Sequence, residues 1–287
     1  MLFPYAGIEK RALEMYLSDI EKSDLPPESK LIATLSAKKT IKKLKNQKSV
    51  ADQAVSNAKE GTVFDASSGV NNDWLDRFMD AAGFVSEEQV QQMWGKVLAK
   101  EFETPGSTPH NMVRILSEIT LKHAEAFQKI CSMKRLLVFI DSNEGAKLIR
   151  NDIVVPFKGN ETEFHTLGLS FNLLNELETL GLIKFDSVNG FDALNIPEKS
   201  IITYIDGVTQ EIESHKKNRL PIGNVTLTEA GDCLCRIVQP THIPNYISLE
   251  KKYMLNNGVA FKDNSRYTIF QNKNGKLSIH ETSEPTE

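Results

Sequence analysis

Between residues 71 and 130, apolar positions recur every three or four residues, which is the spacing of one face of an α-helix. The cap-type residues Asn71 to Asp73 precede the first run, and Gly83 follows it. This pattern predicts a helix with a capped start and a glycine stop at a positive φ. Its apolar face consists of Trp74, Leu75, Phe78, Met79 and Ala82.

Three further helices are predicted in the same stretch. Ser86 and Gln89 match a capping box ahead of a second apolar stripe. Thr108 and Pro109 are typical of the start of a third helix, and Thr120 caps a fourth. Both tryptophans of the chain lie on these stripes with aliphatic neighbours, so we expect a helical core. Its predicted members are Trp74, Phe78, Trp94 and Leu98.

The first 60 residues predict two more helices. Ile8, Leu13, Tyr16 and Ile20 mark an amphipathic helix. The Leu25–Ser29 segment, which contains two prolines, interrupts it, and a second helix then runs to residue 58. Residues 60–70 are rich in Ser and Gly and predict a loop.

The second half has a mixed pattern. Residues 129–150 continue the helical spacing, and a leucine-rich helix is predicted over 167–180 with Gly181 as its stop. Strands at 182–185 and 201–205 and a helix over 232–238 follow. This order of elements resembles a winged-helix module. The leucine-rich helix contains no Lys or Arg, so we expect protein interaction or packing from it and not DNA reading.

After residue 246, two short strands joined by a turn at 272–275 predict a β-hairpin, and residues 281–287 predict a polar tail. The predicted fold class is therefore α+β and mainly α. We expect a helical domain at 1–130, a winged-helix-like α+β domain at 131–245, and a β-hairpin extension with a polar tail at 246–287.

Composition is that of a soluble globular protein, with 40% hydrophobic and 25% charged residues. No stretch approaches the roughly 20 apolar residues that span a bilayer, and the first residues do not have the pattern of a signal peptide. Three cysteines, Cys131, Cys233 and Cys235, suit a reducing compartment. These features together predict a cytoplasmic protein.

Charge is unevenly distributed along the chain. Residues 30–60 are rich in lysine, whereas residues 161–213 are rich in acidic residues, and the two could attract each other within a chain or between chains. Together with several Leu- and Met-bearing helices, this predicts a homo-oligomer, most simply a two-fold dimer. The lysine stripe has two interpretations. It contacts phosphate or anionic lipid, or it is a solvated or partner-binding face, which we favour because no aromatic residues interleave it. Its members are Lys38, Lys39, Lys42, Lys43, Lys45 and Lys48.

Motifs for catalysis are missing from the sequence. There is no phosphate-binding loop, dinucleotide fingerprint, H-E-x-x-H or G-x-S-x-G motif. Cys233 and Cys235 have no second pair at zinc spacing, and we interpret Asp73, Asp76 and Asp80 as favourable charges near a helix start. We therefore predict no catalytic, cofactor-binding or metal-binding residues and no cofactor. An enzyme whose site is assembled from distant residues stays a possible alternative.

Roughly the first half of the chain also resembles a known bacterial family. The resemblance rests on the pattern D-W-L-x-R-F, then V-S, W, L-A-x-E and P-G-S, which begins at Asp73 and continues to Phe127. The upstream segments 4–25 and 38–55 resemble the same family. The family is one of unknown function and is reminiscent of the abortive-infection alpha proteins, which are linked to phage exclusion. The resemblance implies no catalytic residues.

Our leading hypothesis from the sequence is a cytosolic, non-enzymatic interaction protein of a bacterial or phage conflict system of abortive-infection type. It would bind an unidentified partner protein and self-associate. The alternative is a nucleic-acid-binding regulator that uses the Lys38–Lys48 helix and the winged-helix-like domain. The second alternative is an unrecognised enzyme.

Overall fold

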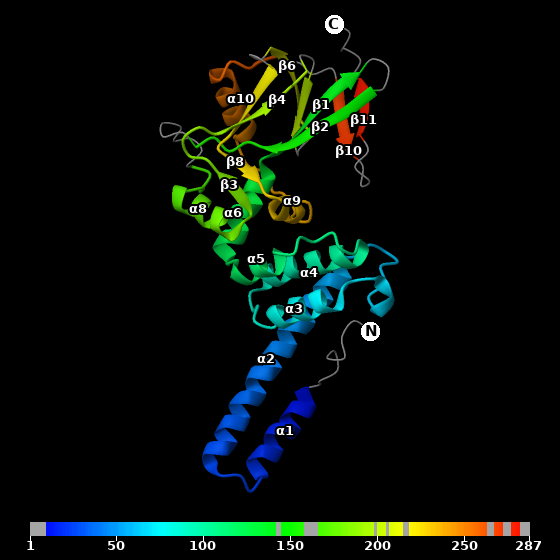
Figure 1. Cartoon of the computed structure of the whole chain (residues 1–287), viewed down its shortest axis with the longest axis vertical. Helices are drawn as coiled ribbons and strands as arrows, with labels where there is room; N and C mark the ends of the chain where they lie inside the picture. Colours follow the sequence, from blue (N-terminus) through cyan, green and yellow to red (C-terminus); the bar gives the residue numbers. More distant parts are fainter. Residues whose placement is uncertain are drawn as a thin grey trace. The chain divides into compact units, whose positions relative to one another are not determined.

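The computed structural model of the chain describes residues 10–141, 145–157, 166–197, 200–204, 207–214, 218–262, 267–271 and 277–281 (Figure 1). The chain divides into two compact units, Met1–Leu121 and Lys122–Glu287. Helices make up unit 1, and unit 2 combines helices with small antiparallel sheets, so the predicted fold class, α+β and mainly α, is confirmed. The finer division at residues 130 and 245 stays a prediction.

Unit 1 begins with a helical hairpin and continues with a group of shorter helices. Pro27 opens the second helix at a position where its missing N–H is no loss. The elements are α1 (Lys10–Lys22), α2 (Pro27–Asn57), η1 (Ala66–Ser68), α3 (Asn72–Ala82), α4 (Glu88–Glu103) and α5 (Met112–Glu118).

Aromatic side chains fill the centre of unit 1. The ring centroid of Phe78 lies 4.8 Å from that of Trp74 and 4.7 Å from that of Trp94. The Trp94 indole N–H donates to the main-chain carbonyl of Leu116 at 3.2 Å, so this buried ring keeps its polar atom satisfied. Phe78, Trp94 and Leu98 are fully buried, and Trp74 is nearly so.

Two of the predicted helix starts in unit 1 are wrong. α4 has Glu87 at its N-cap without a side-chain cap, so Ser86 and Gln89 form no capping box. α5 begins at Met112, and Thr108 lies ahead of it. The Thr108 main-chain N–H donates instead to the buried carboxylate of Glu101 at 3.0 Å. This carboxylate orders the turn between α4 and α5 from a distance of seven residues, which a local cap pattern does not show.

Side chains of α2 contact the end of α3. The Asn46 side-chain amide donates to the Gly83 carbonyl at 2.9 Å, and that of Gln47 donates to the Met79 carbonyl at 2.7 Å. Gly83 has φ −59°, so the predicted reason for a glycine there is wrong. A Cβ at Gly83 would lie 2.3 Å from Cγ of Lys43, and the glycine is needed for this contact.

The largest sheet among the described strands of unit 2 has five strands, in the order β2-β1-β5-β6-β9 with antiparallel neighbours. The predicted helix over 129–150 is therefore wrong beyond residue 132, where α6 ends. Residues of β1 alternate between half-buried and buried, and a register shift between Leu137 and Val138 leaves two buried residues side by side. The sequence from Leu136 to Ile140 is apolar throughout, so it does not show this alternation. The elements are α6 (Leu121–Ser132), β1 (Lys134–Asp141), β2 (Gly145–Ile153), β5 (Ser200–Tyr204), β6 (Thr209–Ser214) and β9 (Ala260–Lys262).

The remaining strands of unit 2 form three two-stranded ladders. β3 (Ile183–Phe185) pairs with β8 (Val225–Leu227), and β4 (Phe191–Leu194) pairs with β7 (Arg219–Gly223). The predicted C-terminal hairpin is present as β10 (Tyr267–Gln271) and β11 (Leu277–Glu281). Its turn at 272–275 and residues 282–287 of the predicted tail lie outside the described residues.

Helices α8 (Phe171–Leu180), α9 (Glu229–Cys235) and α10 (Tyr246–Asn256) complete unit 2. Ser170 caps α8 by accepting from the Leu173 N–H at 3.3 Å, and Gly181 ends it with φ 88°. Thr228 caps α9, so this helix begins three residues before the predicted start at Asp232. The sequence pattern did not predict α10.

Candidate interaction surface

The α1–α2 hairpin lies at one end of unit 1. From Lys43 onward, α2 contacts α3 and α4, beginning with the ion pair between Lys43 and Asp80. Before that residue, α1 is its neighbour among the described helices of unit 1 (Figure 1). The turn between the two helices is fixed by the Ser23 hydroxyl, which donates to the Ile20 carbonyl at 2.6 Å. The hairpin therefore presents one side to α1 and the other to solvent.

Apolar side chains are exposed on the solvent side of α2. Leu31, Ile32 and Leu35 are 60%, 68% and 58% exposed, whereas Ala37 on the side toward α1 is buried. Positions 31 and 35 are one helical turn apart and 32 adjoins them, so the three side chains share a face. Exposed leucine and isoleucine side chains gathered on one face are typical of interaction surfaces.

The six predicted contact lysines do not act as one set. Lys38, Lys39, Lys42 and Lys45 are exposed. Lys43 forms an ion pair with Asp80, and its Nζ lies 5.5 Å from the ring centroid of Phe84. Lys48 pairs with Asp52 at 2.7 Å, one turn along the same helix. Lys43 and Lys48 are thus paired within unit 1, whereas the other four lysines have exposed side chains.

Charge changes sign along the exposed face of α2. Glu28 at the start of the helix is exposed, as is Asp24 in the turn before it. The apolar residues follow, and beyond them come the exposed lysines 38, 39 and 42. We call this surface the hairpin face and define it as Glu28, Leu31, Ile32, Leu35, Lys38, Lys39 and Lys42.

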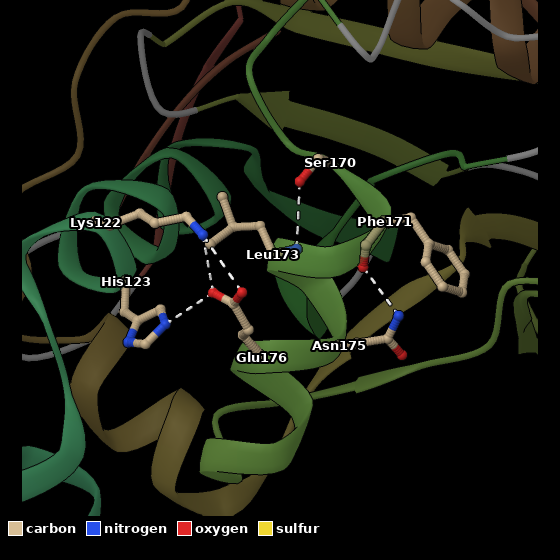
Figure 2. Close-up of polar contacts among 7 residues, drawn as sticks. All are labelled: Lys122, His123, Ser170, Phe171, Leu173, Asn175 and Glu176. Carbon is tan, nitrogen blue, oxygen red and sulfur yellow. Dashed lines mark hydrogen bonds and ion pairs between the residues drawn. The ribbon is translucent and has the colours of Figure 1, made fainter.

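In unit 2, polar side chains gather where α6 meets α8 (Figure 2). The Glu176 carboxylate lies 3.0 Å from Nζ of Lys122 and 3.0 Å from Nε2 of His123. These hydrogen bonds, that of Lys122 first, hold the pKa of Glu176 below its usual value. In the same view, Ser170 and Asn175 bond to main-chain atoms of α8 itself. The cluster ties α8 to α6 and orders the start of α8.

A buried ionic cluster lies between the five-stranded sheet and α10. Arg135 on β1 pairs with Glu250 on α10, and both side chains are fully buried. In the sheet, Arg135 stands between Asp152 on β2 and Tyr204 on β5 in cross-strand register. Burial raises the pKa of Glu250 although the Arg135 guanidinium opposes this shift. No local pattern in the sequence indicates this cluster, because its members are far apart along the chain.

The cysteine contact also differs from the C-x-C pair in the sequence. The Cys235 thiol on α9 contacts that of Cys131 on α6, and their hydrogen bond lowers the pKa of Cys235. Burial raises the pKa of Cys131 well above its usual value. Within the described part of the chain, no three His, Cys, Asp or Glu side chains are arranged to hold a metal ion. None of the described helices is both long and apolar enough to cross a bilayer.

The family model described as "Protein of unknown function (DUF2806)" matches residues 35–250. The chain belongs to this family. The DUF2806 match runs from Leu35 on α2 to Glu250 on α10, so it extends into the second half of the chain, beyond the part from which the resemblance was drawn. The resemblance to a family of unknown function is confirmed, and its link to abortive infection stays a prediction. No curated protein and no solved structure matches the chain.

Proposed function

We propose that the chain is a non-enzymatic interaction protein that binds a partner protein through the hairpin face. The observation that carries this proposal is the exposure of Leu31, Ile32 and Leu35 together on one side of α2. Their removal from water stabilises a complex by about 25 cal/mol for each Å² of apolar surface. Exposed lysines at the edge of such a patch favour a partner with acidic side chains.

For the biological setting, we propose a bacterial or phage conflict system of abortive-infection type, with the chain in the cytoplasm. The support is the family resemblance of residues 73–127, which is an analogy between families. Bacteria that express the chain should resist at least one phage of a broad panel, measured as a reduced efficiency of plating. A Leu31→Ser/Leu35→Ser variant should lose this resistance while it accumulates to the same level. Equal plating on cells with and without the chain across the panel would remove the defence assignment.

We also propose that α6 to α9 form a winged-helix-like module used for protein contact and packing. The support is that α8 leads into β3 and β8 leads into α9, with β3 paired to β8, although β4 to β7 lie between the two strands in the chain. α8 carries Glu176 and Glu178 and has no Lys or Arg, so it would repel the phosphates of DNA.

The interaction proposal is tested by a photo-crosslinking amino acid placed at Ile32. We expect covalent adducts with another polypeptide in living cells after irradiation, identified by mass spectrometry. The same amino acid at Val188, which is 75% exposed in unit 2, serves as the matched control. Adducts of equal yield at both positions, or no adduct at Ile32, would defeat the proposal.

A second candidate function is nucleic-acid binding, favoured by the exposure of Lys38, Lys39, Lys42 and Lys45. Lysine neutralises phosphate without reading base edges, so such binding would be nonspecific and would weaken steeply with salt. We expect no gel shift of duplex or single-stranded oligonucleotides near physiological salt. A salt-sensitive shift that is lost in a Lys38→Glu/Lys42→Glu/Lys45→Glu variant would promote this function to first place.

A further inference from the structure

The hairpin face is complementary to itself when it is reversed. Along α2 it runs from acidic Glu28, through Leu31, Ile32 and Leu35, to basic Lys38. All of these side chains are exposed. A second copy of the same face, turned end for end, would place apolar residues against apolar residues and each acidic end against a basic end.

We propose that the partner of the hairpin face is a second copy of this chain, bound with its α2 antiparallel about a two-fold axis. This inference rests on the proposed function of the hairpin as a docking surface and names its occupant. A two-fold contact uses the same patch on both copies, and a self-complementary patch meets that requirement. The α1 helices would lie on the outer sides of the two α2 helices, which makes a four-helix arrangement.

The charge positions fix the register. When the axis is level with residue 33, Glu28 of one copy faces Lys38 of the other, and Leu31 faces Leu35. Asp24, in the turn before α2, then comes level with Lys42 of the other copy. The contact from residue 28 to residue 38 spans about 15 Å at 1.5 Å per residue. This pairing covers the three exposed apolar side chains and neutralises both of their charged borders.

A parallel arrangement is excluded by the same charges. It would place Lys38, Lys39 and Lys42 of one copy against the same lysines of the other. Like charges so placed destabilise a helix pair, whereas opposite charges at close spacing stabilise it. The antiparallel pairing is also distinct from attraction between the basic residues 30–60 and the acidic residues 161–213, because it needs only α2 and the turn before it.

The test reverses single charges in the 287-residue chain. Sedimentation or light scattering measures how strongly each variant dimerises. Glu28→Lys places lysine against Lys38 of the partner copy, and Lys38→Glu places glutamate against Glu28. Each variant alone should dimerise at least about tenfold more weakly than the unaltered chain. An equimolar mixture of the two variants should recover the dimer as a heterodimer, because each new charge then meets its opposite. The double variant Glu28→Lys/Lys38→Glu should recover the homodimer.

Recovery in the mixture is the decisive result, since a variant that weakens the dimer only by local unfolding is not rescued by another variant. Asp24→Lys and Lys42→Glu repeat the design at the next level of the same register and replace the first pair if circular dichroism shows that it has lost helix. A monomeric unaltered chain at micromolar concentration, or a mixture that stays monomeric, would overturn the proposal. Adducts at Ile32 with a different polypeptide and a monomeric chain would reject the self-pairing and leave the proposed interaction function standing.

Discussion

The guanidinium of Arg135 donates to the carboxylate of Glu250, and neither side chain has any exposed surface. The two residues lie 115 positions apart, on β1 and α10, so their pair joins the five-stranded sheet to the last helix. Burying two charges carries a large desolvation cost that their attraction only partly offsets. The pair is therefore sensitive to the loss of one partner alone.

Arg135→Met should lower the free energy of unfolding of unit 2 by roughly 3–5 kcal/mol, because it leaves the Glu250 carboxylate buried without its partner. The double variant Arg135→Met/Glu250→Leu should recover most of this loss, since both charges are then gone. Urea unfolding followed by circular dichroism measures both values. Both tryptophans lie in unit 1, so tryptophan fluorescence provides an internal control. A double variant no more stable than Arg135→Met would contradict this account.

Trp94→Ala should destabilise unit 1 by roughly 3–5 kcal/mol, because it removes a fully buried ring from between Phe78 and the Leu116 carbonyl. The matched control is Tyr16→Ala at a 56% exposed aromatic position of α1, with an expected change below about 0.5 kcal/mol. Thermal melting of both variants checks the difference. An unchanged melting temperature for Trp94→Ala would show that the ring is not a core anchor.

Gly95→Ala should also destabilise unit 1, although alanine is the better helix former by about 1 kcal/mol. A Cβ at residue 95 of α4 would lie 2.4 Å from Cβ of Gln53 and 3.0 Å from the main-chain N of Ala54 on α2. The added methyl group should force the two helices apart, and this cost should exceed the gain in helix propensity. The free energy of unfolding, measured in urea, should therefore fall by about 1–3 kcal/mol. A gain in stability would mean that α2 and α4 do not approach this closely.

Glu176→Gln should show a pH-dependent effect. Hydrogen bonds from Lys122 and His123 lower the pKa of Glu176 in the folded chain below 4.5, so the folded state favours the charged carboxylate. This stabilisation is present above the ordinary pKa of a glutamate and is lost as the pH falls through the lowered value. Melting temperatures of the variant and the unaltered chain should therefore differ at pH 7 and converge in acid. Glu125→Gln, at an exposed position of α6, is the control. A difference that persists below the lowered pKa would exclude the ion pair as its cause.

Local signals predicted the helices whose ends depend on neighbouring residues. The Asn71 side chain accepts from the Trp74 N–H at 3.0 Å, as the cap-type residues predicted. The Ser170 side chain accepts from the Leu173 N–H, so α8 begins four residues after the predicted start at residue 167. Both contacts span three residues, so a single sequence contains all the information they need. The interruption between α1 and α2 before Pro27 and the end of α8 at Gly181 could be predicted from the sequence for the same reason.

Long-range contacts explain what the sequence did not show. Residues 134–141 have helical spacing but become strand β1, because β5 pairs with them in a register that sets Arg135 against Tyr204. β5 lies more than sixty residues further along the chain than β1, so no local pattern in the sequence indicates their pairing. Helix α10 also lacks a side-chain cap, since its N-cap Asn245 has a φ of 63° and makes no such bond.

Only part of the hairpin face could be predicted from the sequence. The sequence showed a row of lysines, and the pairing of Lys48 with Asp52 follows from their spacing of four residues. The pairing of Lys43 with Asp80 joins residues 37 apart, and it removes one lysine from the row. The exposure of Leu31, Ile32 and Leu35 was not predicted, because these positions fit a buried helical face equally well.

The continuity of α2 has a mechanical consequence. Its 31 residues form a rod of about 46 Å, and its C-terminal half packs against α3 at Gly83 and against α4 at Gly95. From its contact with Gly83 at Lys43, the helix extends for about 22 Å back to Glu28. An unbroken helix resists bending, so a force applied near Glu28 would be transmitted along α2 to its first contact with α3, where Lys43 meets Gly83 and Asp80. The hairpin would then act as a lever arm as well as a contact surface, and a load on its tip would strain the junction of α2 with α3 first.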